Sequence, residues 1–162
     1  MANFKPFSGI VKSITDLWTN DVNKAGCNKL VSVESEDGSV VNFVVTPSTY
    51  FVDNVTLKVG DSVTGFYDLN APAPLIFPPQ LRAIVMAKNN SQNIKVDHFN
   101  NRLESSDNQL KLNIGPSTKI LLENNQIFTQ KLGNRNLIVI YGAPTKSIPA
   151  QTTPDKIIVM CK

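Results

Sequence analysis

The chain has 162 residues, of which 41% are hydrophobic and 18% charged, and its net charge is +3. These values are typical of a folded protein and exclude a disordered chain, and its scattered basic residues lack the charge density of a nucleic-acid-binding domain. The first residues contain no apolar signal-peptide core, and no run approaches the roughly 18 apolar residues of a membrane span. We therefore expect a cytoplasmic protein without a membrane partner, with release or incorporation into an extracellular or spore structure left open.

Short β-strands are predicted along the first half of the chain. Apolar residues alternate along 29–35 and 39–46, and Asp37-Gly38 between them favours a tight hairpin because both residues tolerate positive φ. A second hairpin is predicted at Asp53-Asn54, within residues 49–57. The remaining predicted strands of this half are 9–14, 61–69 and 83–88.

Residues 70–81, NAPAPLIFPPQL, form an unusual proline-rich segment. Proline donates no ladder hydrogen bond, so the segment cannot lie inside a central strand, and it is too apolar for an ordinary solvated loop. Leu75, Ile76 and Phe77 therefore need a cover. Two covers are open: the segment folds over its own barrel or between the two halves, or it contacts another subunit or protein.

The second half repeats the pattern of short strands after a polar boundary at residues 88–93. We therefore place a first domain at 1–90 and a second at 91–162. No window sustains a helical period, so helix is limited to about one turn near each Pro-Ser-Thr, where a hydroxyl could cap it. The predicted strands of the second half are 93–96, 100–105, 109–115, 119–128, 136–142 and 156–162.

The two halves also align in sequence. VNFVVTPSTYFVD at 41–53 lies over LKLNIGPSTKILL at 110–122, which displaces Pro47-Ser48-Thr49 by 69 residues onto Pro116-Ser117-Thr118 and keeps the apolar alternation in phase. Later matches follow in the same order, such as AIVMAK over IIVMCK. We predict an all-β chain of two tandem small antiparallel barrels.

This arrangement resembles the small Greek-key barrels that include the OB-fold. The run from Leu57 to Gly65, of the form hydrophobic-x-x-Gly-Asp-x-Val-x-Gly, is similar to barrels in functionally unassigned bacterial proteins. With the Pro-Pro-Gln segment after it, the whole chain looks similar to uncharacterised proteins of clostridial type. The second half departs from the motif, with Asn134-Arg135 in place of Asp61-Ser62 and Ala150 in place of the second proline. The resemblance implies no chemistry.

No catalytic, metal or cofactor site is predicted. The only histidine, His98, follows Asp97, and neighbours on a strand point to opposite faces, so the pair makes no catalytic triad. His98 and two distant cysteines do not form a zinc spacing. Cys27 and Cys161 are expected to be reduced and inert, with a disulfide as the alternative. We expect the chain not to be an enzyme.

The expected function is a structural or protein-interaction module whose partner is itself or another protein. Self-assembly would use β-edges, including the N-terminal ANFKPF, and the proline segment. The alternative is a barrel that binds oligosaccharide or single-stranded nucleic acid, for which Phe66, Tyr67 and Phe77 are candidate stacking residues. The predicted interaction residues are Leu75, Ile76, Phe77, Pro78, Pro79, Gln80, Ile148, Pro149 and Gln151.

Overall fold

The computed structural model describes residues 2–161, and the chain divides into two compact units between Asn89 and Asn90. Strands build both units, and in the described part of the chain the only helical element is one 3-10 turn, Val52–Asn54. The all-β expectation is therefore confirmed.

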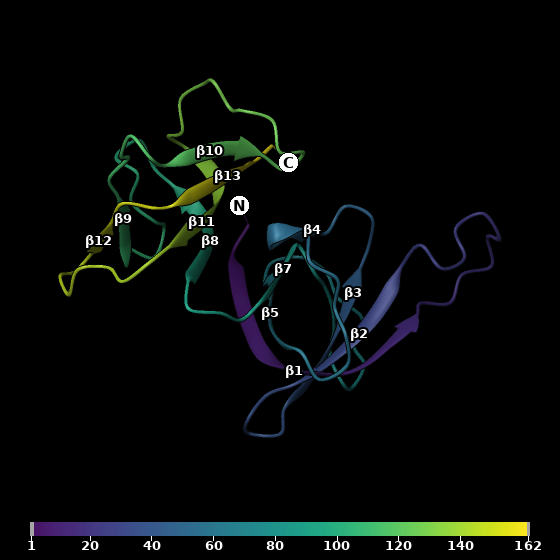
Figure 1. Cartoon of the computed structure of the whole chain (residues 1–162). Helices are drawn as coiled ribbons and strands as arrows, with labels where there is room; N and C mark the ends of the chain where they lie inside the picture. Colours follow the sequence, from purple (N-terminus) through teal and green to yellow (C-terminus); the bar gives the residue numbers. More distant parts are fainter. Residues whose placement is uncertain (1, 162) are drawn as a thin grey trace. The chain divides into compact units, whose positions relative to one another are not determined.

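Seven strands of unit 1 form one sheet, which curves round a common centre (Figure 1). Their order in the sheet is β4-β7-β5-β1-β2-β3-β6. Neighbouring strands are antiparallel except in the pairs β3–β6 and β4–β7, which are parallel. The strands are β1 (Phe4–Asp16), β2 (Lys29–Glu34), β3 (Val40–Val45), β4 (Tyr50–Phe51), β5 (Ser62–Asp68), β6 (Gln80–Arg82) and β7 (Val85–Lys88).

Alternate residues of these strands make the core of unit 1. On β2, Val31 and Val33 are buried while Leu30, Ser32 and Glu34 are only half-buried, as expected for a strand with one apolar face. Phe43 on β3 is fully buried at the centre of the cluster. Gly65 on β5 provides the space for its ring, because a Cβ at Gly65 would lie 2.5 Å from Phe43 Cζ.

Unit 2 has a four-stranded sheet in the order β10-β13-β11-β8 and a parallel pair, β12–β9. Its buried cluster includes Phe99, Leu110, Leu137, Val139 and Ile157. β11 and β13 carry continuous apolar runs, and consecutive residues of both strands are buried, so both sheet faces are covered there. The strands are β8 (Asn93–Phe99), β9 (Leu110–Leu112), β10 (Lys119–Leu122), β11 (Arg135–Tyr141), β12 (Ala150–Thr152) and β13 (Lys156–Met160).

Four strand pairs of unit 1 have counterparts with the same relative direction in unit 2. The antiparallel pairs β1–β5 and β5–β7 correspond to β8–β11 and β11–β13. The parallel pairs β3–β6 and β4–β7 correspond to β9–β12 and β10–β13.

The Pro-Ser-Thr threonines make the same contacts in both units. Thr49 Oγ1 accepts from the Thr46 N–H at 3.0 Å and donates to the Ala83 carbonyl at 2.8 Å. Thr118 Oγ1 accepts from the Gly115 N–H at 3.2 Å and donates to the Pro154 carbonyl at 2.7 Å. Each threonine therefore ties the turn before β4 or β10 to the chain that leads into β7 or β13. The turns themselves contain no helix; the helical content stays within the expected limit, since the one 3-10 turn, Val52–Asn54, begins three residues after Thr49.

One predicted feature of unit 1 is wrong. The Asp53-Asn54 hairpin does not form: both residues take the positive φ that a tight hairpin would use, but they lie in the 3-10 turn Val52–Asn54, and β4 before them pairs in parallel with β7. β1 begins at Phe4 and pairs with β5 of its own unit from Phe4↔Asp68 onward, so one side of the N-terminal segment is occupied within unit 1, and its use as a contacting edge stays a prediction. Pro6 is tolerated there because its ring nitrogen lies on the side of β1 away from β5.

The strand predicted at 100–105 does not form either. Asn100 Oδ1 accepts from the Arg102 and Glu104 N–H groups, and Leu103 takes φ 60°, which makes a turn. Only isolated bridges, such as Phe99↔Ser105, remain of the expected strand. By contrast, the Asp37-Gly38 hairpin between β2 and β3 is confirmed, with Gly38 at φ +85°.

Candidate functional site

The proline segment joins β5 to β6 and exposes its apolar centre. Leu75, Ile76 and Phe77 have exposed fractions of 103%, 54% and 92%. The segment therefore does not fold over the core of unit 1. This packing was one of the two possibilities considered from the sequence.

Hydrogen bonds fix the two ends of the segment. At its start, the Ala71 N–H donates to the Asp68 carbonyl at 3.1 Å, and Asp68 Oδ1 accepts from the Asn3 and Asn70 N–H groups. At its end, the Pro79 carbonyl accepts from the Asn42 N–H at 2.8 Å. The hydrogen bonds therefore hold both ends of the segment that carries the exposed apolar side chains.

The predicted interaction residues lie in two separate segments. Pro78 is half-buried, Pro79 is exposed, and Gln80 begins β6, so these three continue directly from Phe77. In unit 2, Ile148 is 88% exposed, Pro149 is half-buried and Gln151 lies on β12. The structure thus groups the first six predicted residues into one surface and leaves a single large apolar side chain, Ile148, in the second.

A groove of about 520 Å³ runs beside the proline segment. We call it the loop groove. Pro72 and Pro74 form one wall, and Asn28, at the end of the β1–β2 loop, lies on its border. Arg82 is the only charged side chain in its lining, and its Nη2 donates to Ser48 Oγ at 2.9 Å. The groove therefore has an apolar wall and one cation.

Two exposed residues of the β1–β2 loop were missed by the sequence analysis. Trp18 is 82% exposed and Val22 86% exposed, on a loop that extends away from the strands (Figure 1). The available signal was the position of the chain's only tryptophan within a polar, turn-forming stretch. Asn28 of this loop borders the loop groove, whereas Trp18 and Val22 are not part of its lining.

Unit 2 has a groove of about 820 Å³ in the corresponding place, beside the parallel pair β9–β12. Its lining is mainly hydroxyl and amide groups, and several of these bond to one another. Asn113 Nδ2 donates to Gln151 Oε1 at 3.2 Å, and Thr145 Oγ1 accepts from the Gln151 N–H at 2.8 Å. This groove therefore has more polar groups in its lining than its counterpart, with Ala143 and Pro144 as its apolar part.

The candidate stacking aromatics are not grouped on the surface. Phe66 is buried with 5% exposure, and Tyr67 packs against the core cluster of unit 1. Of the three residues considered from the sequence, only Phe77 is available to stack on a base.

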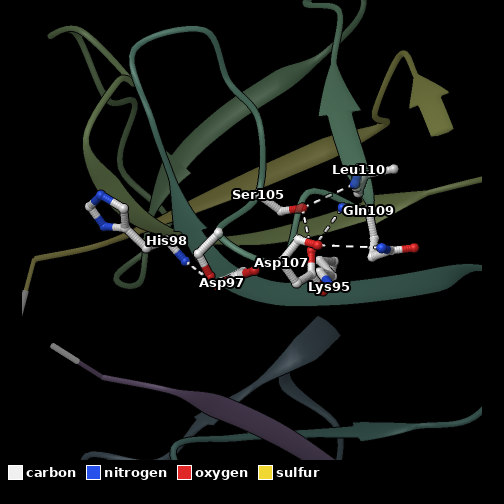
Figure 2. A network of polar contacts seen from close by, with 8 residues as sticks. Lys95, Asp97, His98, Ser105, Asp107, Gln109 and Leu110 are labelled. Carbon is white, nitrogen blue, oxygen red and sulfur yellow. Dashed lines mark hydrogen bonds and ion pairs between the residues drawn. The ribbon is translucent and has the colours of Figure 1, made fainter. Parts of the chain in front are cut away.

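A network of polar contacts joins β8 to the segment 105–109 (Figure 2). Lys95 forms an ion pair with Asp107, whose carboxylate also accepts from Ser105 Oγ and the Gln109 N–H. Burial opposes ionisation of Asp107, but the Lys95, Ser105 and Gln109 donors outweigh it and lower the pKa of this carboxyl. The network holds residues 105–109 beside β8. In unit 1, β2 lies in the corresponding place beside β1.

His98 and Asp97 do not form an acid–base pair. Asp97 Oδ1 accepts from the His98 backbone N–H at 2.7 Å and from the Ser106 hydroxyl. The imidazole is turned away from the network (Figure 2), and its Nδ1 lies 3.2 Å from Asn136 Oδ1. Between residues 2 and 161, no three His, Cys, Asp or Glu side chains are grouped to hold a metal ion. Cys27 and Cys161 are both exposed and free.

Comparisons with protein-family models, curated proteins and solved structures find no match for this chain. The resemblance to clostridial-type proteins therefore remains an expectation. Over the described residues, no helix is long and apolar enough to cross a membrane.

Proposed function

We propose that this chain is a non-catalytic protein-interaction module. It associates through the proline segment, and its partners include other copies of the same chain. The observation that carries the proposal is the exposure of Leu75, Ile76 and Phe77 on a segment anchored at both ends. Monomeric proteins rarely leave such residues clustered in water, and clustered exposed apolar groups mark contact surfaces.

Burial of these side chains is comparable in free energy to the cost of association, so by itself it supports a weak to moderate contact at most. Burying each of the three side chains would stabilise a complex by roughly 1.5–3 kcal/mol, or about 4.5–9 kcal/mol in total. Association opposes this with a cost of about 4–15 kcal/mol in lost translational and rotational freedom. Four prolines flank the apolar residues and restrict the unbound chain, so less ordering is left for binding. The contact should therefore be seen at high protein concentration.

We also propose that each unit is a small OB-like barrel and that the two arose by duplication. The four corresponding strand pairs and the equivalent Thr49 and Thr118 contacts support this. In unit 1, β6 pairs with β3 while β7 pairs with β5, and only Ala83 and Ile84 separate β6 from β7. The Ala83 N–H donates to the Val44 carbonyl of β3 and the Ile84 N–H to the Phe66 carbonyl of β5, so these two residues connect the β3–β6 end of the sheet with β5 and support closure into a barrel.

The proposed interaction is tested by light scattering after size-exclusion chromatography over a range of protein concentrations. Phe77→Ser should weaken self-association roughly 10- to 100-fold, the equivalent of about 1.5–3 kcal/mol. Ile148→Ser is the matched control, because it removes an equally exposed apolar side chain from the corresponding place in unit 2. A parent protein that stays monomeric at every concentration would count against the proposal, as would equal effects of the two variants.

A ligand-binding barrel for oligosaccharide or single-stranded nucleic acid is the second candidate. The loop groove favours it, because Arg82 lines the groove and Trp18 and Phe77 are exposed on the flanking loops. Since Trp18 is the only tryptophan, its fluorescence reports binding directly. A saturable change with single-stranded oligonucleotides or neutral oligosaccharides, lost in Arg82→Gln, would support this function.

A further inference from the structure

Unit 1 carries a second groove at the opposite end of β2 from the loop groove. The loop groove is bordered by Asn28, just before β2, whereas the second groove is lined by Glu34 and Ser35 at the end of β2. Its volume is about 710 Å³, and we call it the hairpin groove. At about 3.3 Å per residue, the six residues of β2 separate the two grooves by roughly 20 Å.

The hairpin groove combines an apolar contact point with negative charge. Ile10 lines it and is 38% exposed although it lies in the middle of β1. Glu34, Glu36 and Asp37 also line it, and the only cation there, Lys12, lies 3.9 Å from Glu34. Hydrogen bonds from Ser35 and Ser39 lower the pKa of Asp37 to about 2, so this carboxylate is ionised at every working pH.

The proline segment has the complementary character. Its centre offers three exposed apolar side chains, Leu75, Ile76 and Phe77. Arg82 is the charged residue of the groove beside them, and no acidic side chain lines that groove. An apolar projection with a neighbouring cation therefore lies at one end of unit 1, and an acidic groove with an apolar contact point lies at the other.

We propose that the proline segment of one copy docks into the hairpin groove of the next copy, in head-to-tail order. This inference rests on the proposed function and names the partner surface. Because the two contacting surfaces are different parts of the same unit, the contact is heterologous, and it builds rings or open chains instead of a closed pair. Charge complementarity between Arg82 and the hairpin carboxylates orients the contact and makes it weaken as salt is added.

The test is cross-linking between two single-cysteine proteins in a Cys27→Ser, Cys161→Ser background. Ala73→Cys places a thiol beside the apolar residues without removing any of them, and Ser8→Cys places one in the lining of the hairpin groove. With a short bismaleimide, the mixture of the two proteins should form covalent dimers at least tenfold more than either protein alone. Thr129→Cys, an exposed position in unit 2, replaces Ser8→Cys as the control.

The outcomes separate this inference from the proposed function. Ala73→Cys protein that cross-links to itself but not to the Ser8→Cys protein would show an isologous contact and overturn the head-to-tail proposal, while the proline segment would remain the interaction surface. Absence of any cross-link together with a monomeric parent protein would overturn both. If the head-to-tail contact forms, Asp37→Lys in the Ser8→Cys protein and Arg82→Glu in the Ala73→Cys protein should each reduce cross-linking at least fivefold. Mixing the two charge-reversed proteins should restore cross-linking.

Discussion

Substitution of Gly65 by alanine tests the packing that shapes unit 1. A Cβ at this position would lie 2.5 Å from Phe43 Cζ, 2.7 Å from Phe43 Cε2 and 2.8 Å from Met86 Sδ. Ordinary contacts begin at 3.4 Å, so the ring must move by about 0.9 Å. Phe43 and Met86 are fully buried, so neither side chain has free space to move into.

Overpacking of this kind costs about 1–3 kcal/mol. We therefore expect Gly65→Ala to lower the free energy of unfolding of unit 1 by that amount, measured by urea denaturation followed through the near-ultraviolet signal. Phe43→Leu in the Gly65→Ala background should restore part of the loss, because the smaller side chain vacates the space needed by the new methyl group. Gly142→Ala is the control, since a Cβ there meets nothing within 4 Å. A Gly65→Ala protein as stable as the Gly142→Ala protein would refute the reasoning.

Three further predictions concern stability and the exposed loop. Thr49→Val and Thr118→Val should each lower the free energy of unfolding by about 1–3 kcal/mol, because each removes a hydroxyl that donates to a backbone carbonyl. A marked difference between the two variants in urea melts would argue against equivalent roles of the two threonines. The pKa of Asp107 is lower in the folded state than its ordinary value of 3.8. The ionised carboxylate therefore stabilises unit 2 at pH values above 3.8, and this contribution is lost as the pH falls through the folded-state pKa. Urea midpoints measured between neutral and acidic pH should therefore fall less steeply for Asp107→Asn than for the parent. Trp18→Ala should leave stability within about 0.5 kcal/mol of the parent, because its side chain is exposed, and a larger loss in the melt would show that the ring packs on the protein.

Local patterns in the sequence predicted much of unit 1. The alternation along β2 and β3 follows from one buried face, and the positive φ of Gly38 follows from the tight connection between them. The exposure of Phe77 is consistent with its prolines, which leave residues 70–79 outside the strands, whereas Gln80 and Leu81 enter β6. The segment was singled out from its composition, and its contact with a partner surface stays a prediction.

The failures occur where contacts distant in sequence decide the local structure. Asp53 and Asn54 favour a hairpin turn by residue type, but β4 pairs with β7, more than thirty residues later, and this pairing turns the chain elsewhere. The first strand was predicted at 9–14 but begins at Phe4, and Pro6 is tolerated because its missing N–H falls on the outer side of β1, which only the register with β5 reveals. The 100–105 strand is replaced by a turn whose side-chain bonds to Asn100 compete with the ladder. Trp18 gave no periodic signal at all, since a loop residue has no repeating face.

The most direct test of the central claim is methyl NMR of the parent protein as its concentration rises from about 10 μM to about 1 mM, a range that covers moderate self-affinity. If the proline segment is the contact surface, the methyl signals of Leu75 and Ile76 should shift or broaden with concentration while that of Ile148 stays unchanged. Leu75 and Ile76 signals that are constant over the whole range, or an Ile148 signal that moves with them, would contradict the account.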